Sequence, residues 1–420
     1  MRYDKQQLLS FYKDQLMNDF MRFWEKAMDR EYGGVFTCYS NDGKCLISTD
    51  KYVWSQGRFT FVLSKLAEEI GKGYIEGERD LYLDQAEKTC EFIFNNAILD
   101  EKDGICSYLL TREGKKKESI TGKGFYTSFY VGCFVAMGFA QFAKASGKTV
   151  WLDRAISLYD RTIKDVNAGK IVAEPFPINK NFDAHAVSMI FTNVTMILAD
   201  AAKTLNHPRY DEINLKSVGH VNDVFSKFYN EKSSLIFEMV PKKPGYEDTF
   251  LARNLCPGHA VECMWFCIPV ILKNNLPLMD KVYKVVKSNI NVSFDKENGG
   301  IFRLVDCDGG APKGRLIGDK LEDIVIATWD SKLWWPSVET LYSSLLCYVF
   351  SGDEEFADIY DKVYEYSFRT FPNPDREVGE WLQICNREGK PEDRVVALPV
   401  KDPYHITRAF LMIIELMSES

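Results

Sequence analysis

The sequence has no long basic stretch, no apolar run of membrane-spanning length and few histidines. Its 420 residues carry 52 Lys and Arg against 60 Asp and Glu, a net charge of −8. This charge argues against nucleic acid or an anionic membrane as a partner. The longest apolar run, around residues 130–143, is too short to cross a bilayer. With only five histidines in the chain, the position of each one is informative.

The cysteines show neither paired nor CxxC spacing. There are eleven, an odd number, scattered along the chain. Such a pattern is typical of buried thiols in a reducing compartment. The opening residues Met1–Phe20 are amphipathic and charged throughout, so we expect no signal peptide. Together these features predict a cytoplasmic protein.

Two segments of the chain are near copies of each other. Asp29–Phe36 reads DREYGGVF, Asp295–Phe302 reads DKENGGIF, and each continues to a second glycine turn. Extended residues flanked by turn formers are typical of β-hairpins. Weaker relatives recur at roughly even spacing, at Gly104–Gly114, Glu174–Asn179, Leu235–Gly245 and Gly379–Gly389. The sequence therefore predicts six short hairpins in a repeat architecture.

The stretches between the hairpins are long enough for two helices each. One set has an apolar and a charged face, as expected of outer helices: Leu81–Phe94, Val150–Val166, Asp211–Tyr229 and Asp353–Phe371. The other set is apolar almost all round and should be buried: Phe125–Ala143, His259–Leu272 and Leu333–Phe350. Six such pairs predict an all-α fold, a closed (α/α)6 barrel in one domain over residues 1–420. The alternative, two separate helical bundles, would not require six matched hairpins.

Closing the ring gathers the starts of the six inner helices at one end, and the unusual residues lie there. His259 and His405 follow prolines with the spacing Pro-x-His, and proline is typical of a first helical turn. His185 and Arg58 lie near the expected starts of two further inner helices, and Tyr126 near the start of another. These positions recur at the repeat spacing, so we expect them to line one central cavity.

Three of the five histidines thus fall on this rim. The positive end of a helix dipole disfavours an imidazolium ion, so a rim histidine tends to stay neutral. A neutral imidazole accepts a proton, and its ordinary pKa suits general acid–base catalysis. We therefore expect acid–base chemistry in the cavity, although a lone buried histidine is more often structural. The other two, His207 and His220, are expected to be structural.

Carboxylates and aromatic rings accompany the rim histidines. Glu262 lies one turn after His259, and Glu339 lies four residues after Trp335, so each pair shares a helix face. These carboxylates are expected to orient a histidine or to bind a ligand. The structural alternative is a buried carboxylate satisfied by hydrogen bonds. Aromatic side chains suited to the apolar faces of a ligand are Trp54, Tyr126, Trp334, Trp335 and Trp381.

Two other motifs lack the context that they need. Ser146–Thr149 reads SGKT, like the end of a phosphate-binding loop, but Phe142 stands where the first glycine is required. His259 and Glu262 could form half of a metal site, but the sequence has no HExxH motif and no Cys/His cluster. We therefore predict neither a metal nor any other cofactor.

Four stretches of the chain resemble the N-acylglucosamine 2-epimerase and cellobiose 2-epimerase superfamily. They are Asp50–Arg58 (DKYVWSQGR), Asn254–Glu262 (NLCPGHAVE), Lys332–Glu339 (KLWWPSVE), and Gly379–Leu382 (GEWL) followed by Pro403–His405 (PYH). In this order and spacing they are highly specific, and the resemblance covers nearly the whole chain. It implies the (α/α)6 barrel that the repeats also predict, and it implies a homodimer.

The resemblance also implies a role for the rim residues. His259 and His405 would be the acid–base pair at C2 of a reducing sugar, and Glu262 would be the partner of His259. Arg58 would stabilise an enolate intermediate. Contacts with the sugar are expected from His185, Trp335, Glu339, Tyr126 and Trp381.

The predicted reaction is the interconversion of N-acylglucosamine and N-acylmannosamine. The stretches around Arg58 and Glu339 resemble that branch most, but His185 matches a histidine of cellobiose epimerases and of aldose–ketose isomerases. Either of those activities is an alternative. A glycoside hydrolase would need two carboxylates flanking the bond, for which Glu262 and Glu339 are available. A sugar-binding protein without activity is the last alternative.

Overall fold

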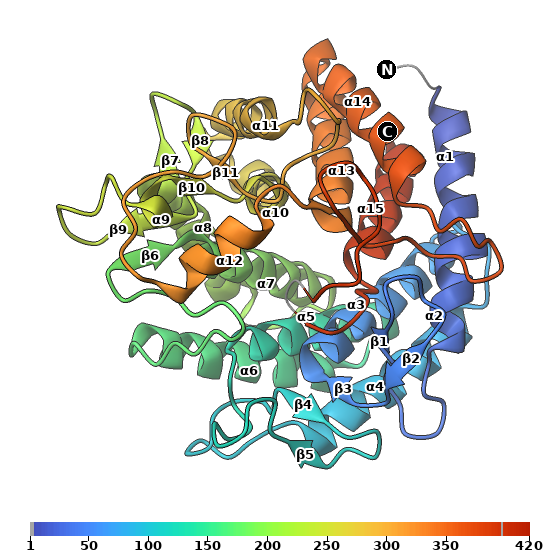
Figure 1. The fold of residues 1–420 in the computed structure, drawn as a ribbon. Helices are drawn as coiled ribbons and strands as arrows, with labels where there is room; N and C mark the ends of the chain where they lie inside the picture. The colour runs from blue at the N-terminus through green and yellow to red at the C-terminus, as the bar shows by residue number, and fades with distance from the viewer. Residues whose placement is uncertain (1–3, 396–397) are drawn as a thin grey trace.

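The computed structural model describes residues 4–395 and 398–420, and in these ranges the protein is mainly helical. Six of the described helices form an inner ring in which each contacts the next, and the last contacts the first (Figure 1). They are α3 (Val53–Gly71), α5 (Tyr130–Ser146), α7 (His185–Thr204), α10 (Pro257–Asn274), α13 (Trp334–Ser351) and α15 (His405–Glu419).

Each inner helix packs against an outer partner. The outer layer contains α4 (Arg79–Asn96), α6 (Thr149–Asn167), α8 (Tyr210–Asp223) with its continuation η2 (Val224–Phe228), α11 (Met279–Ser293) and α14 (Glu354–Thr370). The N-terminal segment supplies the sixth partner, through α1 (Lys5–Asp14), η1 (Gln15–Met21) and α2 (Arg22–Lys26), with α1 against α15. The predicted (α/α)6 barrel is confirmed.

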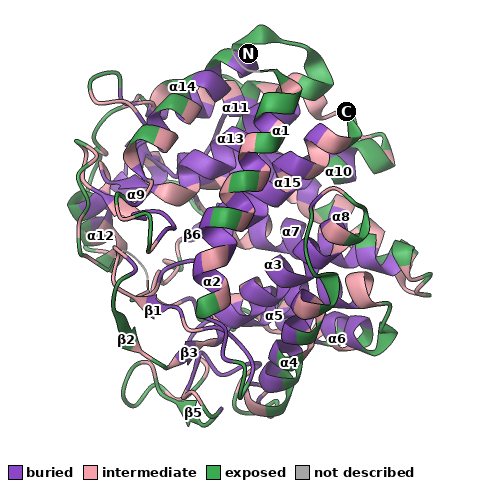
Figure 2. Ribbon diagram, turned by 90° about the vertical axis from the view of Figure 1, so that its right-hand side faces the viewer, coloured by how far each residue is buried: buried purple, intermediate pink, exposed green. Residues whose placement is uncertain are grey.

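The inner helices are buried because they are apolar on nearly every face, as Figure 2 shows for the middle of the molecule. Two glycines let α3 and α5 approach closely. A Cβ atom on Gly57 would lie 2.6 Å from the backbone of Phe134, and one on Gly138 would lie 2.4 Å from the Gly57 carbonyl oxygen. This close contact fixes the first turns of α3, which carry Arg58.

Helix α7 alone among the described helices is long and apolar enough to cross a membrane by length and composition. Its mean hydropathy is 1.3, and 72% of the relevant window is buried inside the protein. Such burial is the property of a core helix.

Most of the short strands join successive repeats rather than forming local hairpins. Four of them directly precede inner helices: β3 (Lys51–Tyr52), β6 (Phe182–Ala184), β10 (Asn254–Leu255) and β12 (Lys332–Leu333). Their antiparallel partners are β4 (Leu109–Leu110), β9 (Met239–Pro241), β11 (Val305–Asp306) and β13 (Ile384–Cys385). The local hairpins pair β1 (Cys38–Tyr39) with β2 (Leu46–Ser48), β4 with β5 (Lys116–Lys117), and β7 (Tyr229–Asn230) with β8 (Leu235–Ile236). Four of the six inner helix starts are therefore held by strand pairing with the next repeat.

Three sequence predictions about the elements are wrong. The described strands form three local hairpins instead of the six predicted. The segment Glu174–Asn179 forms no strand among the described residues. The inner helix predicted from Phe125 begins at Tyr130, because the preceding backbone is hydrogen-bonded elsewhere. The carbonyl of Phe125 accepts from the amide of Tyr108, and the amide of Phe129 donates to Val172.

The near-copy segments form the same buried ion pair twice. Lys51 Nζ lies 2.9 Å from Asp29 Oδ2, and Lys332 Nζ lies 3.1 Å from Asp295 Oδ2. Both lysines belong to the strands that precede inner helices. The repeated segment therefore ties the loops at the rim to the starts of α3 and α13.

The long connection between β11 and β12 carries a further helix that the sequence analysis did not predict, α12 (Lys320–Thr328). Its start is a capping box formed by Asp319 and Glu322. Asn179 Nδ2 donates to Asp319 Oδ2 at 2.6 Å, which fastens α12 to the loop before β6. In Figure 1, α12 lies in front of the ring, on the side where the inner helices begin.

Candidate active site

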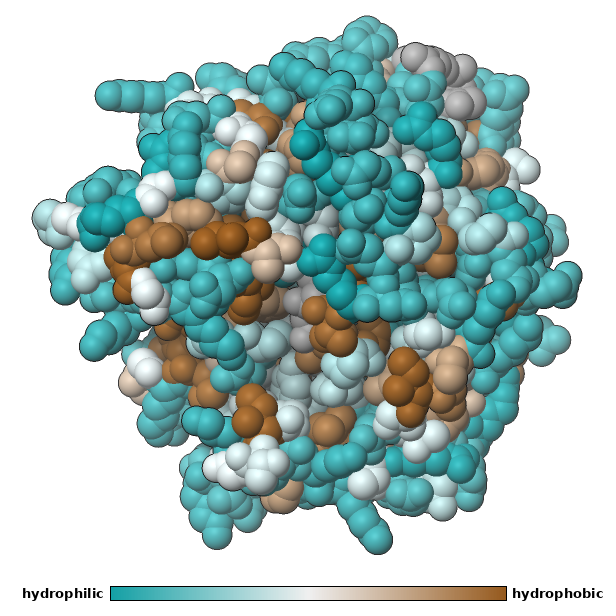
Figure 3. All heavy atoms as spheres, in the orientation of Figure 1, coloured by the Kyte–Doolittle hydropathy of each residue, from teal (hydrophilic) through white to brown (hydrophobic). Residues whose placement is uncertain are grey.

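A cavity of about 280 Å³ opens at the end of the barrel where the inner helices begin. All six inner helices contribute to its wall near their N-terminal ends. Five of them supply Arg58, Tyr130, His259, Trp335 and His405, and α7 supplies Ala186. Apolar atoms surround the centre of this face in Figure 3. The predicted central cavity is therefore present, and both Pro-x-His histidines line it.

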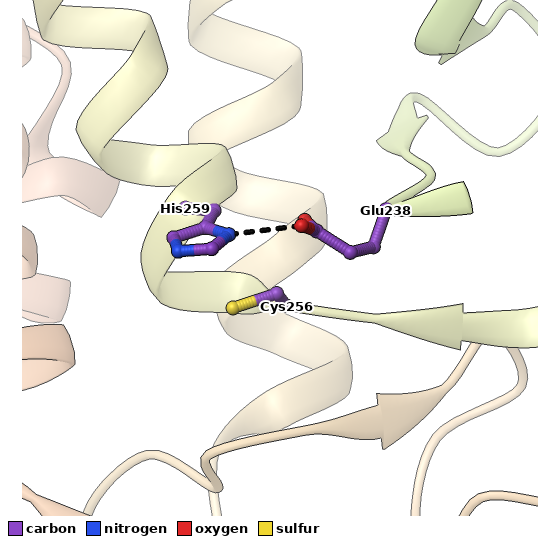
Figure 4. A group of neighbouring side chains, drawn as sticks. All are labelled: Glu238, Cys256 and His259. Atoms are coloured by element: carbon purple, nitrogen blue, oxygen red, sulfur yellow. Dashed lines mark hydrogen bonds and ion pairs between the residues drawn. The ribbon is translucent and has the colours of Figure 1, made fainter. Parts of the chain in front are cut away.

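His259 is paired with a carboxylate from a neighbouring loop. Pro257 begins α10, and His259 follows in its first turn. Its Nδ1 donates to Oε1 of Glu238 at 3.0 Å, and Cys256 lies beside both (Figure 4). Burial opposes protonation, but Cys256 and Glu238 raise the pKa of His259 well above its ordinary value. Burial also opposes ionisation of Glu238, but His259 and His185 lower its pKa to about 2. The surroundings of His259 therefore favour its imidazolium form.

His405 has the opposite protonation preference. It is the first residue of α15, and its Nδ1 lies 2.7 Å from Oε1 of Glu339. Burial lowers the pKa of His405 to about 3, against the influence of Asp402 and Glu262 and with the help of Arg58 and Arg408. The ring is therefore neutral, and because Nδ1–H donates to the carboxylate, Nε2 carries the free lone pair.

A buried charge network supports His405. Arg408 Nη2 donates to Oε1 of Glu262 at 2.5 Å and also to Oε1 of Glu339. Trp265 Nε1 donates to the other oxygen of Glu339 at 2.8 Å. Arg408 bridges both carboxylates, so one buried cation offsets part of their negative charge, and burial raises the pKa of Glu339. The imidazole of His405 is thereby held on a rigid support.

Trp335 lies against both histidines. Its ring centroid is 5.3 Å from that of His259 and 5.6 Å from that of His405. The close approach depends on Gly258, where an added Cβ would lie 2.3 Å from Cζ3 of Trp335. One indole therefore contacts both acid–base candidates.

Arg58 enters the cavity from α3 and rests on aromatic rings. Its guanidinium carbon is 4.0 Å from the ring centre of Phe134 and 5.0 Å from that of Tyr404. The nearest carboxylate oxygen among the described residues, Oδ2 of Asp402, is 3.8 Å from Nη1. Burial lowers the pKa of Arg58, but an arginine stays protonated. The cavity thus contains a half-buried cation with an unused donor.

The cavity has one further arginine. Arg303 is 7% exposed and donates to the hydroxyl of Thr328, and no carboxylate of the described residues forms an ion pair with it. Burial lowers its pKa to about 10. Beside it, α12 presents an apolar wall made of Leu321, Ile324 and Val325.

Comparison with known proteins connects this site to a family. The family model for N-acylglucosamine 2-epimerase matches residues 34–409. The chain belongs to the N-acylglucosamine 2-epimerase family. It is 27% identical over 413 residues to the N-acylglucosamine 2-epimerase of Mus musculus, covering 95% of this chain and 89% of that one. It is 22% identical to the cellobiose 2-epimerase of Ruminococcus albus, with 97% of this chain and 98% of the relative covered.

A solved sugar epimerase from a ruminal bacterium has the same fold. The two structures superpose with a TM-score of 0.77 at 19% sequence identity, over 97% of this chain and 99% of the other. The family assignment therefore agrees with the independently observed barrel.

The structure corrects the predicted partner of His259 in this family member. Glu262 lies on the same helix face, but it binds Arg408 and lies 3.8 Å from Nδ1 of His405. The partner of His259 is Glu238, which the sequence analysis did not select. It lies in the predicted extended segment Leu235–Gly245, but no spacing rule connects that segment to the start of α10. The pairing of β9 with β6 places Glu238 beside the start of α7, and α7 neighbours α10 in the ring.

Two predicted sugar contacts lie behind the cavity wall. Glu339 is fully buried and serves His405. His185 is fully buried and packs against Phe228, with Nδ1 3.6 Å from Oε2 of Glu238. Neither side chain lines the cavity. Both therefore support catalytic candidates instead of facing a ligand.

Two predicted aromatic contacts are also wrong. Tyr126 precedes α5 and packs over Gly104, outside the cavity. Tyr130, the first residue of α5, lines the cavity in place of Tyr126. Trp381 is fully buried and stacks on Phe371 with centroids 5.5 Å apart. Among the predicted aromatic residues, Trp54, Trp334 and Trp335 do line the cavity.

Proposed function

We propose that this carbohydrate 2-epimerase interconverts N-acylglucosamine and N-acylmannosamine by proton transfer between the two faces of C2. The observation that carries this proposal is the pair of histidines on one cavity with opposite protonation preferences. One imidazole is ready to accept a proton while the other is ready to donate one, which is what inversion at a carbon atom requires.

The reaction begins with the open-chain aldehyde form of the sugar. Nε2 of His405 takes the C2 proton, and the C–H electron pair delocalises onto the C1 oxygen as an enolate. Arg58 offsets this charge in a site with little water. His259 then donates a proton to the opposite face of C2. The reverse reaction exchanges the two roles, and solvent restores the resting protonation.

Arg303 and α12 support an N-acyl sugar as the substrate. The acyl group has a carbonyl oxygen that accepts a hydrogen bond and an alkyl part that is apolar. Arg303 has donors without a carboxylate partner, and Leu321 and Ile324 provide adjacent apolar surface. We place the acyl carbonyl at Arg303 and its alkyl part against α12.

The test is deuterium exchange at C2 followed by NMR in heavy water. We expect exchange and inversion with N-acetylglucosamine and N-acetylmannosamine. Glucose and mannose are the comparison, because an aldose–ketose isomerase would convert them to a ketose, which an acetamido group at C2 prevents. Ketose formation from free hexoses, without reaction of the acylated sugars, would overturn the proposal. Absence of exchange with every sugar would indicate a binding protein.

A hydrolase is disfavoured by the position of the two carboxylates. Glycoside hydrolysis needs both acids exposed to the bond that is cleaved. Glu339 is fully buried, and Arg408 binds both Glu262 and Glu339. Neither carboxylate is therefore free to act as the second acid.

We also propose a cytoplasmic location and a homodimer. All eleven cysteines are free, and nine of them are buried, which suits a reducing compartment. The dimer rests on resemblance to the family. Cell fractionation and light scattering on the purified protein test these two statements separately.

A further inference from the structure

Three metal-ligating side chains meet at one wall of the cavity. Glu238 comes from the loop before β9, Cys256 is the N-cap residue of α10, and His259 lies in its first turn (Figure 4). One ligand atom from each lies within 4.8 Å of the others. All three residues line the cavity, so a small cation could reach them from solvent.

The geometry is close to what a tetrahedral zinc site needs. Zinc binds sulfur at about 2.3 Å and nitrogen or oxygen at about 2.0–2.2 Å, so its ligand atoms lie roughly 3.3–3.7 Å apart. Nδ1 of His259 and Oε1 of Glu238 are 3.0 Å apart, and small side-chain movements would suffice. A backbone hydrogen bond of 2.9 Å from His185 to the Glu238 carbonyl holds the acidic residue in place. The cavity leaves a fourth position for water.

The comparable clusters in the described part of the chain are already neutralised by basic side chains. Arg408 occupies the group of Glu262, Glu339 and His405. Arg253 and Lys313 bind the group at residues 306–308, and Lys65 and Lys72 bind the group of Glu68, Glu69 and Glu415. The ion pairs of Glu238 involve histidine side chains alone. Among the described residues, only this trio therefore combines a carboxylate, a thiol and an imidazole without an ion pair to a lysine or arginine. Arg303 interacts electrostatically with Cys256 but forms no ion pair with Glu238.

We propose that Glu238, Cys256 and His259 form a binding site for a thiophilic divalent cation such as Zn²⁺, and that its occupation inhibits the enzyme. The cation takes the place of the proton shared by His259 Nδ1 and Glu238. Cys256 binds as a thiolate and releases its proton to solvent. An imidazole that is metal-bound at Nδ1 no longer forms the imidazolium that His259 needs as an acid. Only the inhibition rests on the proposed function; the binding does not.

Cobalt provides a test of the site that does not depend on catalysis. Protein treated with chelator and then freed of it is titrated with Co²⁺, whose thiolate complexes absorb by charge transfer. We expect this band at one Co²⁺ per chain, displaced by Zn²⁺. Cys256→Ala should remove the band and weaken Zn²⁺ binding at least about tenfold in calorimetry. Cys45→Ala, which changes an exposed cysteine, is the matched control and should keep the band.

The outcomes separate the two proposals. A wild-type protein without the thiolate band, or a Cys256→Ala variant that keeps it, overturns the site. Zn²⁺ that binds at Cys256 without slowing C2 exchange overturns the inhibition. Zn²⁺ binding at Cys256 in a protein that exchanges no sugar proton upholds the site and contradicts the proposed epimerase activity instead.

Discussion

Nδ1 of His259 lies 3.0 Å from Oε1 of Glu238, within the cavity wall. His405 has its own carboxylate, Glu339, but that pair is buried beneath Arg408. The first environment stabilises an imidazolium ion, and the second stabilises a neutral ring. Burial opposes protonation of both rings. It prevails at His405, where Arg58 and Arg408 also lower the pKa, and is outweighed at His259 by Cys256 and Glu238.

Replacing Glu238 with Gln should leave less of His259 in the imidazolium form that donates the proton. A hydrogen bond to a charged group contributes about 1.5–3 kcal/mol, so we expect kcat to fall about 10- to 100-fold. The pKa of His259 should also fall, because Glu238 raises it. The alkaline limb of the pH–rate profile, where His259 loses its proton, should move to lower pH.

Glu262→Gln is the comparison for this measurement. Glu262 binds Arg408 and does not contact His259, so the alkaline limb should stay where it is. A shift of that limb in Glu262→Gln, without one in Glu238→Gln, would restore the role that the sequence predicted for Glu262.

Replacing either His259 or His405 with Asn should abolish most of the inversion while preserving the fold. General acid–base groups contribute about 10²–10⁴-fold, and each variant should lose at least that much. A variant that keeps the base for one epimer should still exchange deuterium into that epimer without converting it. NMR in heavy water, started from each epimer in turn, measures this. Near-normal turnover in both variants would exclude the acid–base assignment.

The sequence predicted the barrel well because the fold rests on local patterns. The near copies at Asp29 and Asp295, with helices of alternating character between them, define the repeat, and the paired lysines show that these segments are equivalent in space. The position of His259 and His405 at helix starts followed from the prolines before them.

The partners of those histidines could not be predicted in the same way. Helical spacing indicates which residues share a face, so it connected Glu262 with His259. The observed partner, Glu238, approaches from another segment, and Arg408 attracts Glu262 to the His405 side. Likewise, a helix that begins at Phe125 would place Tyr126 in the cavity, but the residues before Tyr130 hydrogen-bond to other loops, which no pattern in the sequence indicates.

Arg58→Met should lower the rate much more than the affinity. Methionine retains an apolar side chain against Phe134 but removes the cation. Because the enolate charge develops only along the reaction path, kcat should fall about 10²–10³-fold while KM changes far less. Steady-state kinetics checks this, with circular dichroism for the fold. An increase in KM with an unchanged kcat would show that Arg58 binds the ground state only.

Arg303→Met should act selectively on acylated sugars. Loss of a hydrogen bond from a charged donor should raise the dissociation constant of N-acetylglucosamine about 10- to 100-fold. Binding of glucose, which has no acyl group, should change little. Calorimetry with both sugars measures the difference, and Arg315→Met, at an exposed arginine paired with Asp248, is the control. Equal weakening for both sugars would remove the acyl assignment.

Gly258→Ala should damage the site by displacing Trp335. The new Cβ would lie 2.3 Å and 2.5 Å from two carbons of the indole, so the ring must move away from its position against His259 and His405. Overpacking of this kind costs about 1–3 kcal/mol of stability, and catalysis should fall as well, because the histidines lose their shared wall.

Gly219→Ala is the matched control, since it lies in α8 with no atom within 4 Å of an added Cβ. That change should keep full activity and stabilise the helix by up to about 1 kcal/mol. Thermal unfolding and kcat/KM, measured for both variants, separate the two effects. If Gly258→Ala loses stability but keeps its kcat/KM, Trp335 does not position the histidines.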